Sequence, residues 1–261
     1  MSRVADVKSA SDLYRMGCNY YAIRNYRKAQ EYLIHAVIRG SSQAARRLYQ
    51  LGCLLLQRQA GDDLHCAEVC FQTLADRGDA ESCLQLGLMC KHGRGRRKDL
   101  PAAFGYFDEA WQLGNPRGAY EAGMLILPEA WRDPEAKAAA VEWFKVAAEE
   151  GITESYRQLG FLFLDHTPEH DREALQWFLR GAETGDTDAM VYASDLCFNG
   201  AGSARNILLG VALLRRAADR GNQKANSILG DLYGSGKYVE RNEYLADQYY
   251  TRARECEDDQ K

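Results

Sequence analysis

Apolar and small residues recur along this chain at intervals of three and four positions. Ala80, Leu84, Gly87 and Leu88 show the spacing in one segment, and the same spacing returns in many others. Residues at i, i+3, i+4 and i+7 share one face of an α-helix, whose other face can then meet water. The pattern therefore predicts a series of short amphipathic helices and an all-α protein.

Two kinds of glycine divide these helices into repeats. The first kind follows a leucine or a similar residue in the middle of a helix, and the second closes a unit of two helices. Both recur about every 36 residues, and a shared period is the signature of a repeat architecture. The mid-helix glycines are Gly17, Gly52, Gly87, Gly123, Gly160 and Gly230, with Ala193 in the remaining unit. The terminal glycines are Gly40, Gly78, Gly114, Gly151, Gly185 and Gly221. The seven repeats they define are 10–40, 41–78, 79–114, 115–151, 152–185, 186–221 and 222–256.

Each repeat is expected to contain a helix–turn–helix pair. The second helix carries alanines at its ends and an aromatic pair between them, as in Ala174, Trp177, Phe178 and Ala182. A mid-helix glycine lowers helix propensity by about 1 kcal/mol, so we expect it where a neighbouring helix approaches closely. A terminal glycine suits the left-handed residue that ends a helix.

These motifs resemble the Sel1-like repeat family, a relative of the tetratricopeptide repeats. The best matches are NQKANSILGDLYGSGKYVERNEYLADQYYTRA at 222–253 and DAESCLQLGLMCKHGRGRRKDLPAAFGYFDEAWQLG at 79–114. The first repeat has a short turn and is more similar to a tetratricopeptide repeat. The resemblance implies one right-handed α-solenoid over residues 1–261.

The glycine-rich basic stretch KHGRGRRKD at 91–99 could be taken for a phosphate-binding loop. It recurs, however, as FNGAGSARN at 198–206 and YGSGKYVERN at 233–242. It also lacks the preceding strand and the G-K-[ST] ending that such a loop needs. We therefore interpret it as the turn between two helices, with Asp99 capping the second helix and its basic residues in solvent.

The fourth repeat carries LPEAWRDPEA in place of a glycine turn, so that Pro128 and Pro134 bracket Trp131. An aromatic residue in a proline-bounded loop is either exposed and available for contact with another protein, or folded back onto its own helix pair. We expect the second arrangement for Trp131.

Composition and charge narrow the function. The chain has 261 residues and a net charge of −4, with +3 in residues 1–130 and −7 in residues 131–261. Neither half is basic enough to predict nucleic-acid binding. No segment reaches the roughly 18 apolar residues of a membrane span, and the N-terminus lacks a signal-peptide core. We therefore expect a cytoplasmic protein whose eight cysteines are reduced thiols.

No residue set predicts a metal or a catalytic site. Cys66 and Cys70 lie four apart on a helix, but buried thiols explain them better than zinc ligands do. His166 and His170 are also four apart, with the helix-breaking Pro168 between them. No cofactor is implied, and the acidic residues do not converge as a catalytic pocket requires.

The resemblance leaves one enzymatic alternative open. A cysteine-rich branch of the family pairs cysteines eight residues apart, and some of its members bind or hydrolyse β-lactams. Cys83 occupies the second of those two places, but Ala75 occupies the first, so that disulfide cannot form. The analogy with a β-lactam-hydrolase-like enzyme is weakened accordingly.

The resemblance also implies a binding groove on the concave face, lined by the first helices. By analogy with tetratricopeptide repeats, its positions lie at fixed distances from the mid-helix glycine. Tyr, Met and Arg among them are favoured at interfaces. We therefore predict a non-catalytic adaptor that binds a protein or peptide partner, while weak self-association of a structural protein stays open. The predicted groove residues are Tyr14, Tyr21, Arg46, Tyr49, Leu56, Leu88, His92, Arg117, Tyr120, Met124, Arg157 and Phe161.

Overall fold

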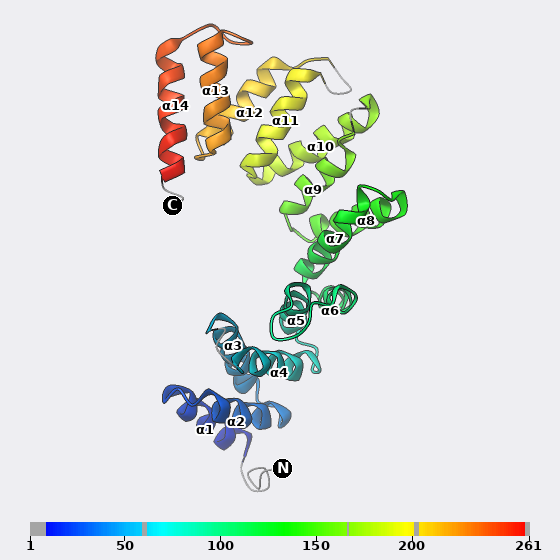
Figure 1. Cartoon of the computed structure of the whole chain (residues 1–261), viewed down its shortest axis with the longest axis vertical. Helices are drawn as coiled ribbons and strands as arrows, with labels where there is room; N and C mark the ends of the chain where they lie inside the picture. The colour runs from blue at the N-terminus through cyan, green and yellow to red at the C-terminus, as the bar shows by residue number, and fades with distance from the viewer. Residues whose placement is uncertain (1–8, 59–61, 166, 201–203, 259–261) are drawn as a thin grey trace. The chain divides into compact units, whose positions relative to one another are not determined.

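The computed structural model describes residues 9–58, 62–165, 167–200 and 204–258. These residues form fourteen α-helices and no strand, so the predicted all-α class is confirmed (Figure 1). The chain divides into two compact units, Met1–Leu125 and Ile126–Lys261, whose boundary falls within one helix. A single solenoid over the whole chain stays a prediction.

In the first unit, consecutive helices pack in pairs, α1 on α2, α3 on α4 and α5 on α6. Their bounds are α1 (Ala10–Ala22), α2 (Tyr26–Ile38), α3 (Ser42–Arg58), α4 (Asp63–Ala75), α5 (Ala80–His92) and α6 (Leu100–Gln112). Helix α7 (Pro116–Ala130) contains the boundary between the units.

In the second unit, α9 packs on α10, α11 on α12 and α13 on α14. Each of the seven predicted repeats therefore holds two helices, a first and a second helix. The bounds are α8 (Pro134–Glu149), α9 (Glu154–Phe163), α10 (Pro168–Thr184), α11 (Thr187–Asn199), α12 (Ile207–Ala218), α13 (Gln223–Ser235) and α14 (Glu243–Asp258).

The mid-helix glycines lie where the two helices of one repeat come closest. A Cβ added to Gly87 would lie 2.5 Å from the ring of Phe107. Gly160 faces Phe178 at the same distance. Phe107 and Phe178 are fully buried, so the ring of each second helix fills the space left by the glycine. The predicted close approach is confirmed.

The sixth repeat achieves the same packing with the two residues exchanged. Its first helix carries Ala193 instead of glycine, and its second helix carries Gly210, where an added Cβ would lie 2.5 Å from the ring of Phe198. Phe198 belongs to the first helix, α11. The glycine and the aromatic residue have therefore changed helices, which explains why this repeat lacks the usual mark.

The terminal glycines adopt the predicted left-handed conformation. Their φ angles run from 78° at Gly78 to 100° at Gly185. Non-glycine residues rarely adopt these angles, so the glycines fix where each second helix ends.

The stretch at 91–99 is a helix–helix turn, as predicted. Gly93 ends α5 with φ 67°, and the Asp99 side chain caps α6 by accepting from the Ala102 N–H at 2.9 Å. The basic residues are not all solvated as expected, because Arg96 forms an ion pair with Glu68 at 3.2 Å.

In the seventh repeat, the turn is aligned with that of the third repeat differently from what a comparison of the two sequences indicates. Gly236, not Gly234, ends the first helix with φ 73° and takes the place of Gly93. Tyr238 then occupies the place of Gly95 and has φ 71°. Its ring stacks on Phe198 at 4.9 Å between centroids. This contact compensates for a backbone conformation that is unfavourable for a bulky residue.

The expectation for Trp131 is wrong. Helix α7 continues through Pro128 to Ala130, and Trp131 follows it with 56% of its surface exposed. Asp133 caps α8, which begins at Pro134, so Trp131 lies in a connection of three residues between the two helices.

Candidate functional site

An open pocket of about 670 Å³ lies between the second and third repeats, in the first unit. Helix α3 contributes one wall, and the ends of α2 and α4 with the start of α5 contribute the others. The buried side chains of Val37 and Leu74 make part of the lining apolar. The lining residues are Val37, Ser42, Ala45, Arg46, Tyr49, Gln50, Leu74, Arg77, Gly78, Asp79 and Glu81.

Tyr49 is fixed in this pocket from two sides. Its ring packs edge-on against Phe71, with 5.6 Å between centroids. Its hydroxyl donates to Glu81 Oε1 at 3.2 Å. Burial, followed by a hydrogen bond with Cys53 and the charge of Glu81, raises the pKa of Tyr49 well above its ordinary value. The phenol is therefore neutral and acts as a donor.

The charged side chains of the pocket differ in their hydrogen-bond partners. Asp79 caps α5 by accepting from the Ser82 N–H at 2.9 Å. Glu81 accepts from Tyr49 with one oxygen and from Asn115 Nδ2, at 2.8 Å, with the other. Within the described part of the chain, Arg46 has neither an ion pair nor a hydrogen bond. The donors of its guanidinium are therefore not used within the described residues.

A smaller pocket of about 300 Å³ adjoins the first one. It is lined by Tyr14, Ser42, Gln43 and Arg46, and so shares two residues with the larger pocket. The start of α3 therefore lines both pockets, with Arg46 of the predicted groove in both, Tyr49 in the larger and Tyr14 in the smaller.

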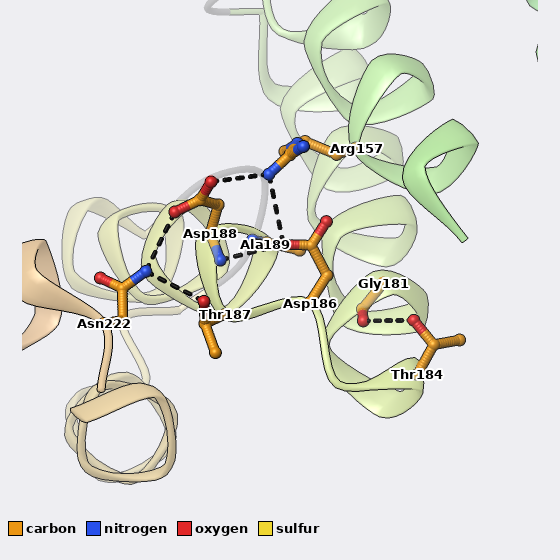
Figure 2. A network of polar contacts seen from close by, with 8 residues as sticks. All are labelled: Arg157, Gly181, Thr184, Asp186, Thr187, Asp188, Ala189 and Asn222. Carbon is orange, nitrogen blue, oxygen red and sulfur yellow. Dashed lines mark hydrogen bonds and ion pairs between the residues drawn. The ribbon is translucent and has the colours of Figure 1, made fainter. Parts of the chain in front are cut away.

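The second unit has a polar counterpart. A pocket of about 370 Å³ lies between the sixth and seventh repeats, and both this pocket and the larger one include the arginine and glycine of an Asp-Arg-Gly sequence. Figure 2 shows the network beside it. Asn222 Nδ2 donates to Thr187 Oγ1 and to Asp188 Oδ1, each at 3.0 Å. Arg157 Nη1 pairs with Asp188 at 2.7 Å and with Asp186 at 3.4 Å.

The two networks follow one rule. Glu81 and Asp188 are each the second residue after a first-helix N-cap. Asn115 or Asn222 of the following repeat donates to the carboxylate. From the preceding repeat, Tyr49 donates to Glu81 and Arg157 donates to Asp188. In each unit, one carboxylate thus links three successive repeats at the starts of their first helices.

Other predicted groove residues are engaged in packing within the protein. Tyr120 is buried, with the Arg117 guanidinium 4.6 Å from its ring centroid. Phe161 lies between the rings of Tyr192 and Phe178, at 4.7 and 5.4 Å. Their role in binding stays a prediction, as it does for the half-buried or exposed Tyr21, Leu56, Leu88, His92, Met124 and Arg157.

Nine of the eleven pocket residues are absent from the predicted set, and four of them, Val37, Leu74, Arg77 and Glu81, lie outside helix α3. The prediction considered only first-helix positions around the mid-helix glycine. These four flank the terminal glycine, where the second helix of one repeat meets the first helix of the next. The Asp-Arg-Gly sequence at 76–78, which recurs at 219–221, is the signal that could have identified Leu74, Arg77 and Glu81.

The cysteines are free thiols where their side chains are described. Burial, ahead of nearby carboxylates, raises the pKa of Cys83 to about 11. The described residues hold no group of three or more metal-ligating side chains. Within the described ranges, no helix has the length and apolar character that a membrane crossing requires.

Comparison with known proteins places this architecture among its relatives. The chain is 31% identical over 165 residues to the mouse protein "DAP3-binding cell death enhancer 1", covering 62% of this chain and 32% of the mouse protein. An uncharacterized protein of Neisseria meningitidis, NMB1327, is 27% identical over 165 residues, covering 62% of this chain and 34% of that protein. The chain spans about a third of the length of these relatives.

Solved structures show the same fold. A Sel1 repeat protein from Oxalobacter formigenes matches with a TM-score of 0.64 at 20% identity, covering 93% of this chain and 96% of that one. Immunity protein PA5088 from Pseudomonas aeruginosa matches with a TM-score of 0.50 at 17% identity, covering 82% of each chain.

The Sel1 repeat model matches five segments, at 80–115, 118–152, 154–186, 187–222 and 223–258. They correspond to the last five of the seven helix pairs. Together with the shared fold, these matches show that the chain belongs to the Sel1 repeat family.

Proposed function

We propose that this protein is a non-catalytic interaction module that binds a segment of a partner protein in the pocket between its second and third repeats. Repeat folds of this kind generally mediate protein–protein interaction. The observation that carries the proposal is the pocket itself, about 670 Å³ in volume, with buried apolar residues and an unpaired arginine in its lining. Ligand pockets in proteins are roughly 300–1,000 Å³.

The pocket is preorganised. Phe71 and Glu81 hold Tyr49 from two sides, and Glu81 is itself held by Asn115. A surface that is already ordered loses little conformational entropy when it binds, so more of the contact energy appears as affinity. The mouse relative, which this chain matches over about a third of its length, is named as a binding protein, and this supports the same class of function.

Selection from a displayed library of short random peptides tests the proposal. Peptides selected on the wild type are then measured by fluorescence anisotropy against Ala45→Trp, which fills the pocket from α3. Gln57→Trp, on an exposed position of the same helix, is the matched control. We expect Ala45→Trp to abolish binding and Gln57→Trp to retain it. Failure to select any peptide, or equal binding by both variants, would refute the proposal.

A further inference from the structure

Two arginine side chains of this pocket, Arg46 and Arg77, keep donors without a partner among the described residues. Of the two carboxylates in the lining, Asp79 caps a helix through Oδ2, and Glu81 accepts from Tyr49 and Asn115. Arg77 uses Nη1 to donate to the Thr73 carbonyl at 3.0 Å. The remaining donors of that guanidinium have no partner among the described residues.

Arg46 differs from the neighbouring arginine. The Arg47 guanidinium lies 5.2 Å from the centroid of the Tyr21 ring, and its Nη1 donates to Gln50 Oε1 at 3.1 Å. Arg46 has no such contact within the residues that the structure describes, and it lines both pockets of the first unit. A planar guanidinium with all its donors free is suited to pairing with a carboxylate.

Apolar surface lies beside these donors. Val37 and Leu74 are at most 4% exposed and contribute to the lining together with Ala45 and the ring of Tyr49. A bulky aliphatic or aromatic side chain placed here would be removed from water, which favours binding.

We propose, as an extension of the function proposed above, that the pocket recognises an acidic side chain close in sequence to a bulky apolar one. The carboxylate pairs with Arg46, and with Arg77 where the segment reaches it. The apolar side chain occupies the space beside Val37, Leu74 and Tyr49. The partner is therefore a protein segment of mixed acidic and apolar character.

The test uses the peptides selected on the wild type. Each is compared with a version in which its acidic residues are replaced by the corresponding amides. We expect this change, and separately Arg46→Gln, to weaken binding about tenfold or more, since a hydrogen bond to a charged group contributes about 1.5–3 kcal/mol. Arg47→Gln is the matched control and should change binding less than about twofold, well below the tenfold that 1.4 kcal/mol gives. Because Arg46 and Arg47 are adjacent on one helix, a general loss of stability would affect both variants.

Charge reversal gives an independent outcome. Arg46→Glu should lose the acidic peptides and bind versions that carry lysine in place of the acidic residue. The extension is overturned if the selected peptides lack acidic residues, or if Arg46→Gln binds like the wild type while Ala45→Trp does not. That second pattern leaves the peptide-binding function intact. Dimerisation that Ala45→Trp abolishes would instead identify a second copy of the chain as the occupant and overturn the extension.

Discussion

The packing at the mid-helix glycines predicts a specific response to adding one methyl group. Gly87 lies in α5, and an added Cβ would lie 2.5 and 2.6 Å from two carbons of the Phe107 ring. Carbon atoms pack at about 3.5–4.0 Å, so the ring would have to move by about 1 Å. Phe107 is fully buried, and its movement would disturb the neighbouring side chains.

Two opposing effects determine the result of Gly87→Ala. Alanine gains about 1 kcal/mol of helix propensity over glycine. Overpacking a well-packed core costs about 1–3 kcal/mol. Gly105 isolates the first effect, because it is exposed in α6 of the same repeat and an added Cβ would have no atom within 4 Å. We expect Gly105→Ala to raise the free energy of unfolding by about 1 kcal/mol.

Urea denaturation followed by circular dichroism measures both variants. The difference in unfolding free energy between Gly105→Ala and Gly87→Ala equals the packing cost, about 1–3 kcal/mol, with Gly87→Ala the less stable. If Gly87→Ala stabilises the protein as much as Gly105→Ala, the close-approach explanation of the mid-helix glycines is refuted.

Three further predictions concern the sixth and seventh repeats and one buried thiol. Asn222→Ala should lower the free energy of unfolding by about 1 kcal/mol more than Asn206→Ala, since both cap helices but only Asn222 also bonds the preceding repeat; equal losses in urea denaturation would contradict this. Tyr238→Ala should destabilise more than Tyr238→Gly by about 1 kcal/mol, because both lose the stacking on Phe198 but glycine relieves the left-handed backbone; the reverse order of melting temperatures would refute it. Because burial raises the pKa of Cys83 to about 11, the unfolded thiol ionises first, and stability falls as pH rises from the ordinary thiol range toward 11. Cys83→Ala should show a shallower alkaline decline in urea titrations, and an unchanged slope would count against it.

The helix pairs could be predicted from the sequence because the same spacing of glycines and apolar residues recurs in successive repeats. A glycine and an aromatic residue about twenty positions apart have a local physical meaning, and Gly87 with Phe107 confirms it. The exchanged pair Phe198 and Gly210 could not be recognised so easily, because the same packing is kept while the glycine and the aromatic residue lie on the opposite helices. Aligning the glycines of the two turn sequences also gives the wrong register around Tyr238, where the backbone hydrogen bonds identify the turn.

The candidate site was predictable only in part. Arg46 and Tyr49 followed from their spacing to the mid-helix glycine, and the structure brings them together. Spacing alone could not separate these residues from Phe161, which occupies a similar helical position but is packed between two rings. That distinction depends on the size of the residues in the next repeat. A rule based on spacing within a single helix does not include those residues.

The most direct measurement is a crystal structure of the protein with a peptide selected from the library. We expect the peptide between the second and third repeats, with an apolar side chain against Val37 and Leu74 and a carboxylate within hydrogen-bonding distance of Arg46. A peptide bound elsewhere on the molecule, with this pocket empty, would contradict it.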